Sequence, residues 1–245
     1  MTDNATNPCL TAAPSRESSK WPGIFPGLFF TPVFVGAQKL VFGRMLSLRS
    51  FRRTQFPMSQ ANSLSHDDII AQTTEWLEKA VIGLNLCPFA KAVHVKKQIR
   101  YVVSDVTTPE ALLEDLRREL EVLAEANPEK IDTILLIHPY VLKDFLDFND
   151  FLDVADGLLE ELELDGILQI ANFHPDYQFA DTSIDDIENY TNRAPFQTLH
   201  LLREESIDRA VESFPEAETI YEKNIETMQK LGIEGWHQLF SGNKE

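Results

Sequence analysis

Two histidines, each followed directly by a proline, are the residues in this chain whose type and position most clearly suggest chemistry. His138 follows the apolar run 133–137, and His174 follows the apolar run 167–173. Both runs are typical of buried strands, and a proline cannot continue a central strand. If both strands lie in one parallel sheet, both imidazoles emerge at its carboxyl edge, where open α/β sheets bind ligands. Imidazoles at such an edge can act as general bases or as metal ligands.

A cysteine supplies a further candidate for chemistry. Cys87 stands directly before Pro88, and a proline at the first position of a short helical turn through Val93 would make Cys87 the N-cap of that turn. The amide dipoles at a helix start favour thiolate over thiol, and Lys91 lies one turn further along. In the alternative interpretation, the thiol is buried and packs as a small hydrophobe. The predicted catalytic residues are Cys87, His138 and His174.

A third histidine extends the set of possible metal ligands. His200 lies in the short apolar run 198–202, which is a candidate fourth strand. Neighbouring strands lie about 5 Å apart, so histidines on adjacent strands can reach one ion. The predicted ligands of a divalent metal ion are therefore His138, His174 and His200. The chain has no HExxH or paired CxxC spacing to support a metal site, and each histidine can equally be a core or turn residue bonded to the backbone.

Two arginines in the last third of the chain are candidates for binding an anion. Arg193 and Arg203 stand close to other polar side chains in a strongly acidic protein, and a guanidinium can hold a carboxylate or phosphate with two hydrogen bonds. Both can instead form structural ion pairs. The predicted ligand-binding residues are Lys91, Tyr177, Tyr190, Asn192, Arg193, His200 and Arg203.

The elements that must position these residues alternate between helix and strand. The pattern predicts a capped helix over 65–84, strand 99–104, helix 108–126, strand 131–137, helix 141–164 and strand 166–173. This alternation is typical of an α/β domain with right-handed crossovers. We predict a mostly parallel central sheet of three or four strands with helices on both faces. The histidines converge only if the second and third strands are neighbours.

The last third of the chain departs from this alternation. Residues 174–197 form a long irregular segment, which is typical of a lid or a binding loop. Two C-terminal helices are predicted after the candidate fourth strand, over 206–213 and 215–231, and the second has a proline near its start and a glycine at its end.

The first 57 residues have a different composition from the rest. They are rich in Pro, Gly, Phe, Ser and Arg, and they carry a net charge of about +5 on a chain whose total is −17. The apolar stretch 22–41 is too interrupted by proline and glycine to cross a membrane. We interpret 1–57 as a disordered or spurious extension, with Met58 as the true start and organellar targeting as the alternative. Residues 58–245 are then a single α/β domain.

Composition also limits the partners. The acidic surface repels phosphate backbones and anionic lipids, so we expect a small-molecule ligand, no nucleic acid and no membrane, and leave the oligomeric state open. Two cysteines are too few for a disulfide framework, which suits a reducing cytoplasm. The GxGxxG, GxxxxGK[ST] and GxSxG motifs are absent, which disfavours dinucleotide binding, P-loop phosphoryl transfer and ordinary serine hydrolysis.

These observations favour a small cytosolic α/β enzyme that acts on a small molecule. Hydrolysis or group transfer at the carboxyl edge of the sheet, through cysteine and histidine or through a divalent metal ion, is the leading hypothesis. The alternative is a non-catalytic binding module for an anionic metabolite, built around the two arginines.

The order of several short motifs resembles a known family. These motifs occupy residues 83–90, 136–139, 144–151, 173–180, 189–193 and 199–204. Together they resemble domain-of-unknown-function family 1415, from about residue 66 to the C-terminus. The resemblance implies no particular reaction, so the functional hypotheses rest on residue chemistry.

Overall fold

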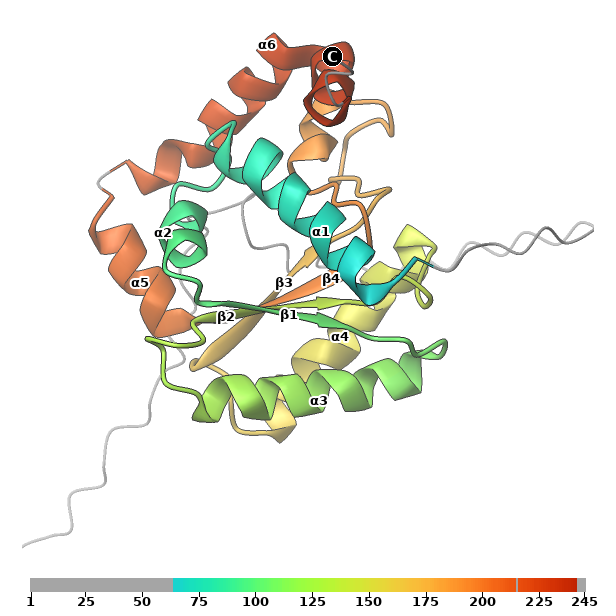
Figure 1. The fold of residues 1–245 in the computed structure, drawn as a ribbon, viewed down its shortest axis with the longest axis vertical. Helices are drawn as coiled ribbons and strands as arrows, with labels where there is room; N and C mark the ends of the chain where they lie inside the picture. Colours follow the sequence, from blue (N-terminus) through green and yellow to red (C-terminus); the bar gives the residue numbers. More distant parts are fainter. Residues whose placement is uncertain (1–63, 215, 242–245) are drawn as a thin grey trace, which may run out of the picture.

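The computed structural model describes residues 64–214 and 216–241 (Figure 1). The predicted extension, residues 1–57, and the boundary at Met58 lie outside these residues. From residue 65 to residue 173, helices and strands alternate along the chain in the predicted order, with a short extra helix before the first strand. The protein is therefore of the mixed α/β class.

Four strands form the sheet, in the order β1-β2-β4-β3. β1 and β2 pair in parallel, whereas β4 pairs antiparallel with both of its neighbours. Three strands consequently run in one direction and β4 runs against them, which confirms the candidate fourth strand. Two of the three strand pairs are antiparallel, so the pairing within the sheet is not mostly parallel as predicted. The strands are β1 (Ile99–Val103), β2 (Thr133–Ile137), β3 (Leu168–Phe173) and β4 (Thr198–Arg203).

β4 lies between β2 and β3, the strands that precede His138 and His174. The predicted convergence of these histidines required β2 and β3 to be neighbours, and that requirement is not met, because the two strands run in the same direction but do not pair. The physical reason lies in the connection 174–197, which leaves β3 at its carboxyl end and returns to the same edge. A strand that starts there must run antiparallel, and Leu199 and Leu201, both fully buried, fill the central position.

Helices cover both faces of the sheet, as predicted (Figure 1). On one face, α3 (Pro109–Glu125) and α4 (Phe145–Glu161) enclose a core with Ile134 and Leu136 of β2. The alternate residues of β2, Leu135 and Ile137, point to the other face, where α1 (His66–Trp76) and α6 (Ile220–Phe240) lie. We call these the α3–α4 face and the α1 face.

The helix starts follow from capping chemistry. Ser65 and Asp68 form a capping box at the start of α1, and Thr108 caps α3 before Pro109. α4 begins at Phe145 rather than near residue 141, because the Asp144 carboxylate accepts hydrogen bonds from two first-turn amides. Leu142 has a φ of 54°, so the chain is not helical there.

The predicted helix 65–84 changes type halfway. After Trp76 the chain continues as a π-helical turn, η1 (Leu77–Ile82), which ends at Gly83. π-helical turns are rare and occur frequently near functional sites. Here the turn supplies Leu77 and Val81, which line a cavity on the α1 face together with Trp76.

The remaining elements are short except for α6. They are α2 (Ala90–Val95), η2 (Ile187–Thr191), α5 (Glu204–Glu212) and η3 (Ala217–Thr219). The C-terminal helix predicted over 215–231 does stop near Gly232, which has a φ of 67°, but a second helical segment follows it to Phe240. Nothing in the sequence pattern predicted that segment.

Candidate functional site

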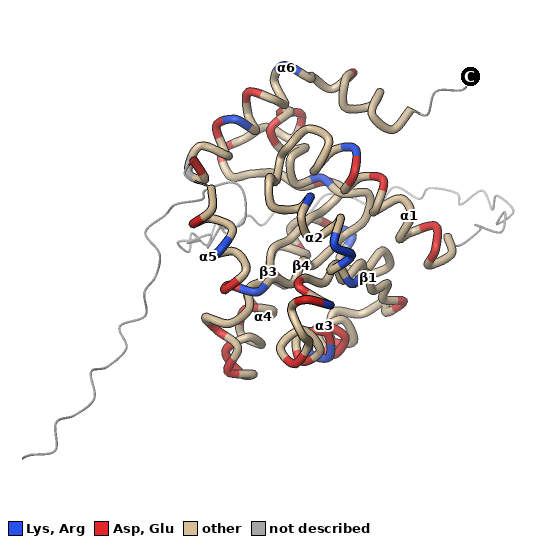
Figure 2. Tube along the Cα trace, turned by 60° about the vertical axis from the view of Figure 1, so that its left-hand side comes forward, with Lys and Arg blue, Asp and Glu red and all other residues tan. Residues whose placement is uncertain are grey.

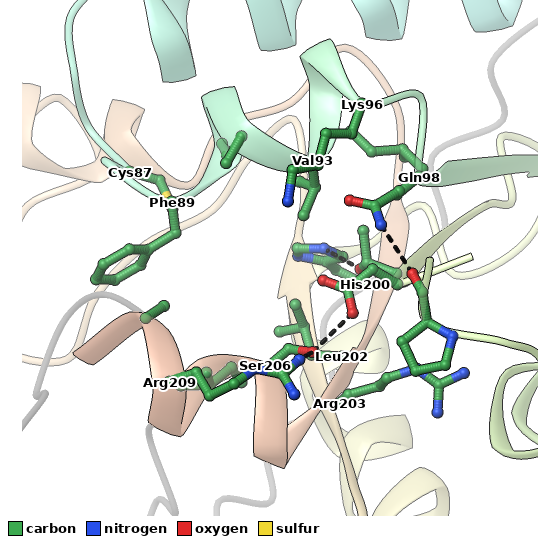
Figure 3. Close-up of a pocket in the computed structure, with 18 of the residues that line it drawn as sticks. Cys87, Phe89, Val93, Lys96, Gln98, His200, Leu202, Arg203, Ser206 and Arg209 are labelled. Carbon is green, nitrogen blue, oxygen red and sulfur yellow. Dashed lines mark hydrogen bonds between the residues drawn. The ribbon is translucent and has the colours of Figure 1, made fainter. Parts of the chain in front are cut away.

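A cavity of about 880 Å³ lies on the α1 face, at the end of the sheet where β1 and β2 begin. Thr133, His200 and Leu202 are among the strand residues that line it, and α2 and α5 border it on two sides (Figure 3). Its volume is in the range of small-molecule sites, roughly 300–1,000 Å³. The cavity is at the opposite edge of the sheet from the carboxyl edge at which the sequence predicted a site.

The two bordering helices are unusual because neither contains a buried residue. Their apolar side chains line the cavity, among them Val93 of α2 and Ile207 and Val211 of α5. Phe89 and Phe214, just outside the two helices, meet edge to face with ring centroids 6.0 Å apart. Apolar side chains of α2 and α5 thus line a void, although Val211 of α5 also packs against the buried pair Ala217 and Ile220.

His200 lies within this cavity lining as a neutral imidazole. The Thr133 hydroxyl donates to the carbonyl oxygen of Leu201 at 2.6 Å, so its oxygen accepts from His200 Nε2 at 2.7 Å. Burial lowers the pKa of His200 to about 4. The ring of Phe173 packs against it at 5.9 Å between centroids.

Cys87 lines the same cavity, where its surroundings favour the thiol over the thiolate. Backbone amides of Phe89 and Ala90 bond to its sulfur, as the predicted helix start implied, and they act to lower its pKa. Burial of the thiol outweighs them and raises the pKa of Cys87 above its ordinary value. The protonated thiol is therefore favoured.

Polar groups gather at one side of the cavity (Figure 3). Ser206 donates to the Asp132 carboxylate at 2.7 Å and accepts from Arg209 at 3.0 Å. Lys96 extends from the end of α2 towards these groups. Figure 2 shows lysine and arginine concentrated around α2, on a chain of net charge −17.

His138 and His174 do lie together, but on the α3–α4 face. Both rings pack against Phe148 of α4, at 5.5 and 5.3 Å between centroids. His138 Nδ1 bonds to the carbonyl oxygen of Val141 at 3.3 Å, and His174 Nε2 bonds to that of Leu142 at 3.4 Å. The sheet separates this pair from Cys87 and His200, so the predicted catalytic set does not share one cavity.

The predicted metal site does not fit this arrangement. His138 and His174 face α4, whereas His200 faces the cavity on the other side of the sheet. Within residues 64–214 and 216–241, no three His, Cys, Asp or Glu side chains are grouped so that they could hold a metal ion. The three histidines do not converge because β4 lies between β2 and β3. Side chains of a strand alternate between faces, and His200 of β4 points to the α1 face, away from His138 and His174.

The residues predicted to bind an anion mainly hold the loop 174–197. Arg193 donates to the carbonyl oxygens of Tyr177 at 3.1 Å and Ile184 at 2.6 Å, and lies 4.3 Å from the centroid of the Tyr190 ring. Tyr177 packs against Phe145, Tyr190 packs against Trp236, and the carbonyl oxygen of Asn192 accepts from the amide of His174.

The two remaining cations differ in position. Arg203 borders the cavity, but its guanidinium points away from it (Figure 3), and Nη2 donates to carbonyl oxygens at the end of α3 and after it, including that of Ala126 at 2.7 Å. Lys91 is exposed on α2 and is not part of the cavity lining. Arg193 and Arg203 thus both donate hydrogen bonds to backbone carbonyl oxygens, whereas an anion or a carboxylate was the expected partner.

Three residues that hold the loop or line the cavity were not among those predicted from the sequence. Asn189 is fully buried, and its side chain accepts from the amide of Phe179 and the hydroxyl of Thr182 and donates to the carbonyl of Ser183. Trp76 and Gln169 line the cavity. A polar Gln169 inside a predicted buried strand was a signal for a site on this face, in addition to Cys87 and His200.

Fold and site together define a mixed α/β protein with a cavity on one sheet face, bordered by two incompletely buried helices. The model of the family described as "Protein of unknown function (DUF1415)" matches residues 68–238, and the chain belongs to this family. No curated protein and no solved structure matches the chain. No helix among the described residues is long and apolar enough to span a membrane.

Proposed function

We propose that the protein binds a small, largely apolar molecule in the cavity between α2 and α5. The observation that carries this proposal is that two amphipathic helices line the cavity and bury none of their residues. Protein interiors are normally close-packed, and helices this short depend on tertiary packing for stability. A molecule in the cavity would supply the contacts that α2 and α5 lack.

The geometry supports binding better than the predicted hydrolysis or group transfer. Such chemistry needs a nucleophile activated by an adjacent base. Burial raises the pKa of Cys87, and the predicted bases His138 and His174 lie across the sheet from it. A binding module is therefore the preferred function. We place its binding site in the cavity and not at the loop that contains Arg193.

A substitution that fills the cavity tests this proposal. Val93 of α2 lines the cavity, so Val93→Trp places an indole in the space that a ligand needs. We expect the full chain to bind the neutral fluorescent probe N-phenyl-1-naphthylamine saturably, and Val93→Trp to weaken that binding about tenfold or more, since the lost contacts amount to a few buried methylene groups. Fluorescence titration measures the affinity, and thermal unfolding checks that the variant is folded.

Val95→Trp is the matched control. Val95 is on the same helix, is 69% exposed and does not line the cavity. We expect this variant to bind the probe as the unchanged protein does. Equal binding by the unchanged protein and Val93→Trp, or no saturable binding at all, would contradict the proposed function.

A further inference from the structure

We propose that the ligand of this cavity is an organic acid, with an apolar body and a carboxylate or similar acceptor group. This inference rests on the proposed binding function and adds the chemical class of the ligand. It comes from the polar atoms of the lining, whereas the binding function came from the unburied apolar helices. The two can therefore fail separately.

Two N–H donors of residues that line the cavity have no hydrogen-bond acceptor. They are Trp76 Nε1 and Gln169 Nε2, and each nitrogen atom is buried. Trp76 is 3% exposed and Gln169 is 9% exposed, so bulk water does not reach these groups readily. Buried donors are normally paired, because an unpaired donor loses its hydration without compensation. Both groups are donors, which calls for a ligand that carries acceptor atoms.

The charged residues of the lining favour an acceptor group with negative charge. Lys96 and Arg209 balance the two carboxylates of the lining, Glu129 and Asp132, so the cavity is far less acidic than the protein as a whole, whose net charge is −17. Lys96 forms no ion pair with the other residues that the structure describes.

The two carboxylates do not remove this preference. Asp132 already accepts the hydroxyl hydrogen of Ser206, and Glu129 is exposed. Arg209 is paired with Glu205 outside the lining. The unpaired ammonium of Lys96 and the unpaired N–H groups are thus the groups with hydrogen-bonding capacity left for a ligand.

The rest of the lining suits an apolar body. Aromatic rings of Phe89, Phe173 and Phe214 and the aliphatic side chains of Leu77 and Val81 belong to it. Trp76 and Phe173 pack edge to face at 5.0 Å between ring centroids. An aromatic or branched acid can contact these rings while its acid group accepts from the unpaired donors.

The experiment compares an acid with a neutral molecule of the same shape. Isothermal titration of the full chain with 2-naphthoate and with 2-naphthylmethanol measures both affinities. We expect the acid to bind about tenfold or more tightly, because charge-assisted hydrogen bonds are the stronger ones.

Variants identify the groups responsible. We expect Gln169→Leu and Lys96→Gln each to weaken 2-naphthoate about tenfold while changing 2-naphthylmethanol by less than about threefold. Lys91→Gln, which removes a charge from the same helix outside the lining, should change neither affinity. Without ligand, Gln169→Leu should also melt at a higher temperature, because it removes an unpaired buried donor.

The remaining outcomes overturn the inference in distinguishable ways. Equal affinity for both molecules would refute the acid preference and leave the binding function in place. Tighter binding of the acid that survives both Gln169→Leu and Lys96→Gln would mean that the unpaired donors serve buried water only. Absence of binding by either molecule and by the neutral fluorescent probe would refute the binding function itself.

Discussion

Between pH 6.5 and pH 4 the protein should lose several kcal/mol of stability. Burial lowers the pKa of His138 and of His200 from 6.5 to about 4 in the folded protein, whereas both titrate near 6.5 when unfolded. In this window the unfolded state binds more protons, so stability rises with pH and falls as the pH is lowered. Each histidine contributes a loss of about 3 kcal/mol by pH 4, and the small remainder is lost just below that pH as the folded-state imidazole finishes titrating.

Other groups modify the size of this effect but not its sign. Burial also lowers the pKa of His174, which adds to the loss on acidification. The pKa of Glu204 is raised by burial, so its protonation at low pH favours the folded state and offsets part of the loss. Urea unfolding at intervals between pH 7 and pH 4 measures the slope.

Two substitutions that cannot titrate provide the control for the acid effect. His200→Gln keeps an N–H donor for Thr133, and His138→Asn keeps one for the carbonyl of Val141. The double variant should be less stable at pH 7 but should show a much flatter dependence on pH. If its slope between pH 6.5 and pH 4 equals that of the unchanged protein, these two histidines are not the cause.

Replacing Gly83 by alanine should destabilise the fold, whereas the same change at Gly157 should stabilise it. A Cβ on Gly83 would lie 2.3 Å from the carbonyl oxygen of Lys79, which is closer than real Cβ atoms approach a backbone atom. The π-helical turn must shift to relieve this, at a cost of about 1–3 kcal/mol. Gly157 lies within α4 with nothing within 4 Å of an added Cβ, so alanine there should add about 0.5–1 kcal/mol.

Thermal unfolding of both glycine variants tests this contrast. A change of 1 kcal/mol moves the melting temperature by roughly 2–4 °C in a domain of this size. We expect a lower melting temperature for Gly83→Ala and a higher one for Gly157→Ala. A Gly83→Ala variant as stable as the unchanged protein would show that the turn can relax without loss, and that its π-helical form is not required by close packing.

Local patterns in the sequence predicted much of the fold. The Ser65 cap, the proline at the start of α3 and the alternation of apolar runs located α1, α3 and the first three strands, because caps and periodicity depend on residues close together in the chain. The change from α-helix to π-helix after Trp76 was missed, since a one-residue difference in hydrogen bonding leaves the apolar spacing nearly unchanged.

The candidate site was less predictable. The sequence placed Cys87 at a local turn and His138 and His174 after strands, and each of these local statements holds. It assigned Arg193 and Arg203 to an anion because carbonyl oxygens, their actual partners, are present at every residue and leave no trace in a side-chain pattern. The unpaired donors of Trp76 and Gln169 were invisible for the same reason, since pairing is a property of the packed chain.

The sequence by itself located most of the helices and all four strands, and it indicated that three strands share one direction, because these depend on local geometry and on right-handed crossovers. Only the tertiary structure decided that β4 enters between β2 and β3, since strand order depends on the packing of both sheet faces at once. That one insertion places His200 on the α1 face with Cys87 and leaves His138 and His174 against α4. The position of the cavity follows from it, because side chains of a strand alternate between faces and the order of the strands decides which of them meet.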